Sequence, residues 1–75
     1  MDKTDLIKAR HALGLSQSEA ARLLGYETEQ GKSQYRKLES GARPIMPAQR
    51  RLIEAYLAGY RPPDWPPIAT ILNLN

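Results

Sequence analysis

Four stretches of this sequence have the apolar spacing of an α-helix, and each is closed by a glycine. They are TDLIKARHALG (4–14), SQSEAARLLG (16–25), KSQYRKLESG (32–41) and MPAQRRLIEAYLAG (46–59). Glycine readily adopts the left-handed backbone conformation that often follows the last turn of a helix. No segment alternates apolar and polar residues as a half-buried strand would. The sequence therefore predicts a compact all-α domain of four to five helices.

Local signals indicate where three of these helices begin. Thr4 is the expected N-cap of the first helix. Ser16 and Glu19 have the spacing of a capping box at the start of the second, and Pro47 is accepted in the first turn of the fourth. The 3.6-residue period then predicts the inward-facing residues. These are Leu6, Ala9 and Leu13 in the first helix, Ala20, Leu23 and Leu24 in the second, Tyr35 and Leu38 in the third, and Leu52, Ile53, Tyr56 and Leu57 in the fourth.

The end of the chain has a different composition. Residues 60–75, YRPPDWPPIATILNLN, contain two Pro-Pro pairs. Proline cannot continue a regular helix and restricts the residue before it, so residues 61–67 are expected to be extended. We divide the chain into a helical domain, residues 1–59, and a Pro-rich tail, residues 60–75.

Trp65 lies within the extended part of this tail. We expect its indole to lie over an apolar groove, because an exposed indole leaves a large hydrophobic area in water. Beyond it, Ile68, Ile71 and Leu72 have the spacing of a short helical stripe. The tail either covers the core of its own chain or makes a dimer contact, and the sequence leaves both alternatives open.

The formal net charge of +3 is concentrated in one part of the chain. Residues 32–51 carry a net charge of +5, whereas residues 1–31 and residues 52–75 each carry −1. The basic residues of the central stretch, accompanied by the single acid Glu39, are Lys32, Arg36, Lys37, Arg43, Arg50 and Arg51. Such a concentration is typical of a surface that binds a polyanion. The alternative is an ordinary solvated charged face.

The third helix, about residues 32–40, has two different faces. At 100° per residue, Tyr35, Leu38 and Glu39 point inward. The outward face comprises Ser33, Arg36, Lys37 and Ser40, with Lys32 and Gln34 on its flanks. This face holds no acid, although Glu–Lys pairs usually support an exposed helix. Lysine and arginine can bond to guanine, glutamine to adenine, and serine to bases or phosphates, so the face is suited to a DNA major groove.

The segments LGLSQSEAARLLG and SQYRKLESGAR together resemble the helix-turn-helix domain of the Xre/Cro-type family, the phage-repressor class. The matching positions are Ser16, Gln17, Leu24, Gly25, Glu39 and Gly41. The resemblance covers about residues 4–58 and implies a lambda-repressor-like fold. It also implies a transcriptional regulator that binds double-stranded DNA, most simply a repressor or autorepressor of phage or plasmid type that binds an inverted repeat as a homodimer.

The resemblance also implies roles for individual residues. In the family, the glutamine at the start of the second helix contacts a DNA phosphate, which points to Gln17. Base contacts are expected from Lys32, Ser33, Gln34, Arg36 and Lys37 in the third helix. Phosphate contacts are expected from Ser40, Arg43 and Arg50. Relatives often pair the positions of Arg10 and Glu39 across two helices, and an inward carboxylate needs such a partner. The alternative is that these two are unrelated exposed charges.

This sequence departs from the family pattern between the second and third helices. The connection YETEQGK, residues 26–32, is longer than the family's. Either the third helix begins near Thr28, with Gly31 as a weak point inside it, or the additional residues form a loop. Glu27 and Glu29 suit a helix N-terminus, where negative charge is favoured.

Catalytic and metal-binding functions have little support. The single histidine, His11, has no nearby cysteine or paired carboxylates, so we expect no metal, no cofactor and no enzyme activity. Gly31-Lys32-Ser33 lacks the earlier glycine and the strand of a phosphate-binding loop. The absence of cysteine and of a long apolar run predicts a cytoplasmic protein with no membrane segment. Two other functions remain open, the antitoxin of a toxin–antitoxin pair and a protein-interaction module that does not bind DNA.

Overall fold

The computed structural model describes residues 1–66 of the chain. These residues form four helices, α1 (Lys3–Ala12), α2 (Gln17–Leu23), α3 (Gly31–Ser40) and α4 (Pro47–Leu57). No strand occurs in this part of the chain, so the prediction of an all-helical fold is confirmed. All four predicted closing glycines have positive φ. The stripe expected at Ile68, Ile71 and Leu72 lies outside the described residues.

The first two helices begin with capping boxes. The predicted box of α2 is present, because Glu19 N donates to Ser16 Oγ at 3.1 Å and Ser16 N donates to Glu19 Oε1 at 2.8 Å. The prediction for α1 is wrong, since its N-cap is Asp2 instead of Thr4. Asp2 accepts the N–H of Asp5 at 2.8 Å, and Asp5 accepts the N–H of Asp2 at 3.4 Å. Because both aspartates take part, this cap satisfies two backbone donors instead of one.

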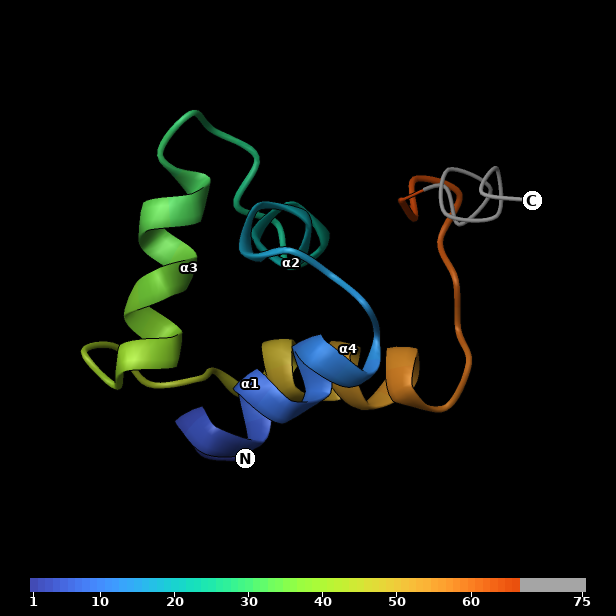
Figure 1. Cartoon of the computed structure of the whole chain (residues 1–75), viewed down its shortest axis with the longest axis horizontal. Coiled ribbons are helices and arrows are strands. Elements are labelled where there is room, and N and C mark those ends of the chain that lie inside the picture. The colour runs from blue at the N-terminus through green and yellow to red at the C-terminus, as the bar shows by residue number, and fades with distance from the viewer. Residues whose placement is uncertain (67–75) are drawn as a thin grey trace.

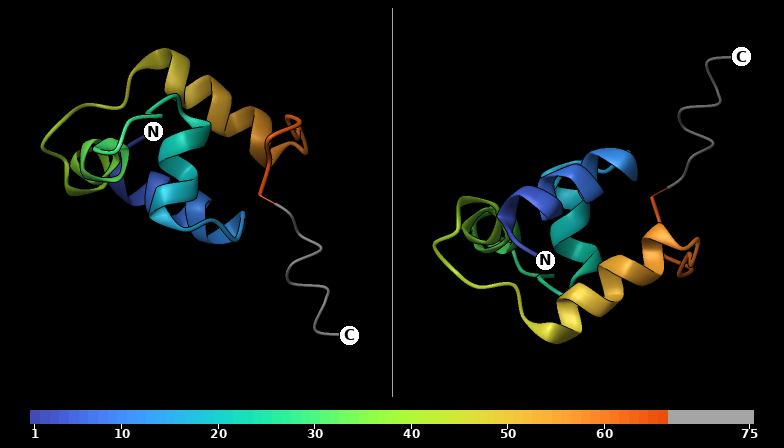
Figure 2. Two further views of the ribbon diagram at one scale, coloured as in Figure 1. Left: turned by 90° about the horizontal axis from the view of Figure 1, so that it is seen from above. Right: turned by 90° about the horizontal axis from the view of Figure 1, so that it is seen from below.

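The core lies where the four helices meet. Helix α3 packs mainly against α2 and also against α1, while α4 packs against α1 (Figures 1 and 2). The buried apolar residues are Leu6, Ala9, Leu15, Ala20, Ala21, Leu23, Tyr35, Leu38, Ile53 and Tyr56. Leu13, Leu24 and Leu52 are partly buried against them. The core therefore uses most of the predicted inward-facing residues.

Leu57 is the exception among the residues predicted to face inward, because it is 49% exposed. The buried arc of α4 is centred between Ile53 and Tyr56, and Leu57 lies toward its edge at the last residue of the helix. It borders an open groove between α1 and α4 that Lys8 also lines. The period alone predicted too wide an apolar face for α4.

Trp65 is the residue of the described part of the tail that packs against the core of its own chain. The expected extended path is wrong for residues 62–65, which form a turn closed by the Trp65 N–H on the Pro62 carbonyl at 3.0 Å. The Trp65 ring meets the Tyr56 ring edge-on, with centroids 5.0 Å apart. The Arg61 guanidinium lies 4.2 Å over the Trp65 ring, and Arg22 of α2 pairs with Asp64 at 3.1 Å. These contacts are what a core-covering segment requires, whereas the dimer contact of the tail stays a prediction. None of the described helices is long and apolar enough to span a membrane.

Candidate nucleic-acid interface

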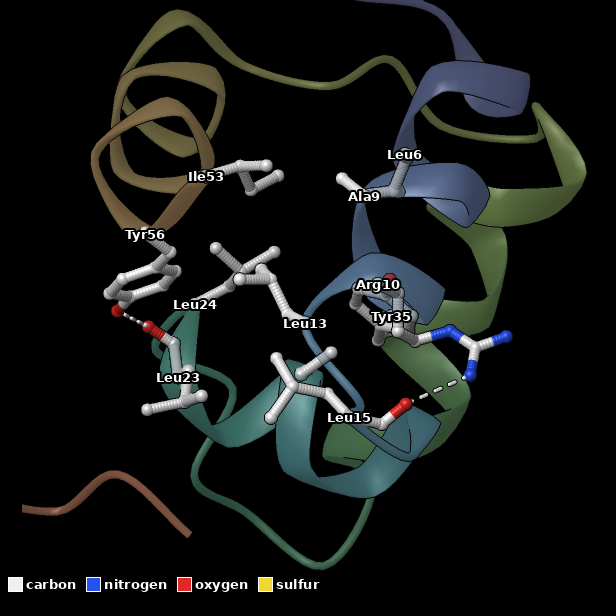
Figure 3. Close-up of a pocket in the computed structure, with 11 residues that line it drawn as sticks. Leu6, Ala9, Arg10, Leu13, Leu15, Leu23, Leu24, Tyr35, Ile53 and Tyr56 are labelled. Carbon is white, nitrogen blue, oxygen red and sulfur yellow. Dashed lines mark hydrogen bonds between the residues drawn. The ribbon is translucent and has the colours of Figure 1, made fainter. Parts of the chain in front are cut away.

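One carboxylate joins three of the helices. The carboxylate of Glu39, late in α3, accepts two hydrogen bonds from Arg10. Nε of Arg10 donates to Oε2 at 2.6 Å, and Nη2 donates to Oε1 at 3.4 Å. The expected pair is thus present, and it is largely buried, with 15% of the Arg10 side chain and 8% of the Glu39 side chain exposed. Arg10 Nη1 also donates to the carbonyl of Leu15 at 3.1 Å, which is drawn in Figure 3. Arg10 therefore holds α3 to α1 and is also bonded to the connection between α1 and α2.

Two further side chains complete this network. Tyr35 Oη donates to Glu39 Oε2 at 2.7 Å, and Gln17 Nε2 donates to Glu39 Oε1 at 2.9 Å. Burial alone would raise the pKa of Glu39, but the hydrogen bonds from Arg10, Tyr35 and Gln17 lower it. Burial and the bond to Glu39 raise the pKa of Tyr35, so its hydroxyl remains a donor. We call these four residues the Glu39 network.

The contact of Gln17 with Glu39 was not foreseen from the sequence. A phosphate-binding role was assigned to this residue, yet its amide is half-buried in the Glu39 network. A side-chain amide carries two N–H groups, so the second remains for another acceptor. Gln17 stands at the first position of α2, where it couples the start of that helix to α3.

The outward face of α3 is exposed and basic. Lys32, Ser33, Arg36 and Lys37 are exposed, while Tyr35 of the opposite face is fully buried. Within residues 1–66, the ion pairs are Arg10–Glu39, Arg22–Asp64 and Arg50–Glu54, so no cation of this face forms an ion pair. Lys32 nevertheless lines a groove with Glu19, Glu27 and Glu29, which lower the positive potential at the start of α3. The face has the composition expected from the sequence.

Gln34 is half-buried at the flank of this face, and its Oε1 atom is buried without a hydrogen-bond partner within residues 1–66. Its position is less accessible than those of the neighbouring cations. The sequence placed it at the flank of the outward face, and the structure agrees.

The last residue of α3, Ser40, and the residues after it form a closing turn. Ser40 Oγ donates to the Lys37 carbonyl at 3.2 Å and accepts the N–H of Ala42 at 3.3 Å. The backbone N–H of Arg43 donates to the same Lys37 carbonyl at 3.1 Å. Ser40 and Arg43 therefore lie in one turn beside Lys37, and the single O–H donor of Ser40 is engaged with the Lys37 carbonyl.

Arg50, the remaining residue assigned to phosphate, lies on α4. Its guanidinium pairs with Glu54 at 3.2 Å, one turn further along the same helix. Both side chains are substantially exposed, at 41% and 53%. Such a pair is an ordinary surface feature, so Arg50 has a weaker claim to a phosphate than Arg43.

The connection between α2 and α3 is a loop, so the alternative in which α3 begins near Thr28 is wrong. Helix α3 begins at Gly31, one residue before the expected start. A Cβ atom at Gly31 would lie 2.1 Å from the Tyr26 carbonyl oxygen, which requires glycine there. Gln49 of α4 donates to the Tyr26 hydroxyl at 2.8 Å and holds the other side of this loop. The start of α3 is thus fixed by packing instead of by a side-chain cap.

Lys3 is a further cation that the sequence did not single out. It lines an open groove at the C-terminal end of α3, together with Ser40 and Arg43. Its approach to α3 depends on the tertiary fold, so no local pattern in the sequence could reveal it.

Within residues 1–66, no group of three histidine, cysteine or carboxylate side chains is placed to hold a metal ion. A comparison with known proteins finds no matching family model, no matching curated protein and no matching solved structure.

Proposed function

We propose that this chain is a sequence-specific regulator that binds double-stranded DNA, with α3 as its recognition helix. The observation that carries the proposal is the outward face of α3, where Lys32, Arg36 and Lys37 are exposed and form no ion pair within the described residues. A double helix is densely anionic and attracts such a face.

A comparison within the chain argues against an ordinary solvated surface. The exposed side of α4 contains an i,i+4 ion pair between Arg50 and Glu54, which is the usual composition of a solvated helix. The single acid of α3, Glu39, is turned inward and used in the Glu39 network. The outward face of α3 therefore carries cations without ion pairs to the same helix. This composition favours an anionic partner.

The proposed division of labour follows the positions of the side chains. Lys32, Ser33, Arg36 and Lys37 read base edges from α3, with Gln34 as the weakest candidate because its Oε1 atom is buried. Gln17, Ser40 and Arg43, with Arg50 as the weakest candidate, hold phosphates. The Glu39 network fixes α3 relative to α1 and α2, so the base-reading side chains are presented from a rigid support. This arrangement is consistent with the helix-turn-helix resemblance of the sequence.

The proposal includes a cytoplasmic homodimer that acts as a repressor or autorepressor. One small domain offers few base contacts, and two copies on an inverted repeat would double them, with half-sites about 34 Å apart. Leu57 and Tyr60 are 49% and 53% exposed near the end of α4, and a second copy could cover them. The antitoxin and protein-interaction alternatives would use the tail, but Trp65 is already packed on Tyr56 of its own chain.

The test is a selection of bound duplexes from a random pool, followed by titration of the selected and a scrambled duplex at several salt concentrations. A specific regulator binds the selected DNA on the order of a thousandfold more tightly, and its affinity falls steeply with salt. The double variant Lys32→Gln/Lys37→Gln should lose this preference, while Lys8→Gln on α1 should retain it. Equal and weak binding to both duplexes contradicts the proposal.

A further inference from the structure

The C-terminal end of α3 meets the beginning of α1. Figure 1 shows the N-terminus of the chain close to the end of α3, and Lys3, Ser40 and Arg43 line one open groove there. Lys3 is the first residue of α1, whereas Arg43 follows α3. The groove thus brings together two cations that are far apart in the sequence.

Gly41 determines how closely Lys3 approaches. A Cβ atom at Gly41 would lie 3.2 Å from Lys3 Cδ and 3.6 Å from Lys3 Nζ. The aliphatic part of the lysine therefore lies against the turn that ends α3, and its ammonium group is brought to the same place. Gly41 has a φ of 86°, so the turn itself also favours glycine.

The two acids nearest to Lys3 in sequence form the capping box of α1 and no ion pair with Lys3. Asp2 and Asp5 each accept the backbone N–H of the other in the capping box of α1. Within residues 1–66, Lys3 is exposed and belongs to none of the ion pairs. Asp2 also lines the groove and moderates its positive potential. The Lys3 ammonium thus remains available for an anion from outside the chain.

We propose that Lys3 is a DNA phosphate-contacting residue that acts with Arg43 on the backbone beside the end of α3. This inference rests on the proposed function and extends it to α1, which carries none of the DNA contacts assigned from the sequence. Lysine binds phosphate as a compact point charge, and its place at the end of α3 lies off the base-reading face. Contacts from both sides of one helix end fix the register of that helix on the duplex.

The test compares Lys3→Gln with Lys8→Gln. Lys8 is an exposed lysine of the same helix, but it lines the separate groove between α1 and α4. Loss of one phosphate contact should reduce the slope of log K against log salt by about 1, and weaken selected and scrambled duplexes alike by roughly fivefold to tenfold at 0.1 M salt. Lys8→Gln should leave both quantities unchanged, and Lys3→Arg should restore the slope.

The competing role of Lys3 is structural, because a cation near the C-terminus of α3 interacts favourably with the helix dipole. A lower melting temperature of Lys3→Gln with an unchanged salt slope would establish that role and overturn the proposal. If Lys3→Gln behaves like Lys8→Gln while Arg43→Gln weakens binding, Lys3 is no phosphate contact and the proposed function stands. If none of these variants affects binding to DNA, the proposed function itself fails.

Discussion

Arg10 Nε lies 2.6 Å from Glu39 Oε2, which ties α1 to the last turn of α3 in a largely buried ion pair. The chain also contains an exposed counterpart, since Arg22 pairs with Asp64 at 3.1 Å with 39% and 56% of the two side chains exposed. Both pairs join an arginine to a carboxylate, but the first is largely buried and belongs to the Glu39 network, whereas the second is exposed. They therefore provide a direct comparison of what each contributes to stability.

The first prediction is that Arg10→Ala destabilises the protein far more than Arg22→Ala. Removal of Arg10 leaves the buried carboxylate of Glu39 without its cation, which typically costs about 3–5 kcal/mol. An exposed pair is worth about 1 kcal/mol or less. Thermal unfolding followed by circular dichroism measures the difference, since about 1 kcal/mol shifts the midpoint of a domain of this size by roughly 4–8 °C. Equal shifts for the two variants would remove the special role of the pair.

The second prediction concerns acid. The Glu39 network lowers the pKa of Glu39 below its ordinary value of 4.5, despite burial. The pKa of Glu39 is thus lower in the folded chain than in the unfolded chain. At a pH between the two values the unfolded chain binds more protons than the folded one, so acid favours unfolding. The contribution of Glu39 is therefore fully present above about pH 4.5 and is lost as the pH falls through the folded pKa.

The pH dependence can be isolated with Glu39→Gln, which removes the titrating group. We expect the stability difference between the native protein and this variant to be constant from pH 7 to about 5 and to shrink as the pH falls further. Urea unfolding at a series of pH values measures it. A difference that stays constant down to pH 3 would mean that Glu39 titrates alike in the folded and unfolded chains.

The third prediction is that Gly31→Ala is destabilising even though alanine is the better helix former by about 1 kcal/mol. The new Cβ would lie 2.1 Å from the Tyr26 carbonyl oxygen, so the loop or the start of α3 must move. We expect a net loss of about 1–3 kcal/mol, as for other overpacked sites. Ser33→Ala, at an exposed position two residues later, is the matched control and should change stability little. A stabilised Gly31→Ala would show that the loop yields easily.

The same glycine illustrates what the sequence could predict. Periodicity, the capping box of α2 and the closing glycines are local, and they predicted four helices and the inward and outward faces of α3. Glycine is needed at position 31 because the Tyr26 carbonyl lies against it, and only the folded chain brings these two groups together. Local reasoning therefore left two alternatives, a loop before α3 or a longer helix with Gly31 as its weak point, and neither included the close contact that Gly31 makes with Tyr26.

Candidate site residues divide in the same way. The exposure of Lys32 and Lys37 followed from helical period alone. The pair of Arg10 and Glu39 was expected because members of the family that the sequence resembles often pair these positions, and because an inward carboxylate needs a partner. The engagement of Gln17 with Glu39 depends on the packing of α2 against α3, which no local pattern encodes.

The fourth prediction tests the attachment of the tail. Trp65→Ala removes the edge-on contact with Tyr56 and the ring beneath Arg61. Because Trp65 is half-buried, we expect a loss of about 1–3 kcal/mol. Chemical denaturation measures this loss, and Arg51→Ala at an exposed position of α4 serves as the control. An unchanged stability together with loss of self-association would instead assign Trp65 to the dimer contact.

The fifth prediction separates base reading from phosphate binding. Lys37 lies on the exposed face of α3, whereas Arg43 lies in the turn that follows it. Lys37→Ala should therefore relax the base preference at one position of the binding site, by about 1–3 kcal/mol of discrimination. Arg43→Ala should weaken all duplexes by about the same factor and reduce the salt slope by about 1. A panel of single-base variants of the selected duplex, titrated with both proteins, measures the two effects. If both variants lose affinity uniformly across the panel, the outward face of α3 binds the DNA backbone and the assignment of Lys37 to a base is wrong.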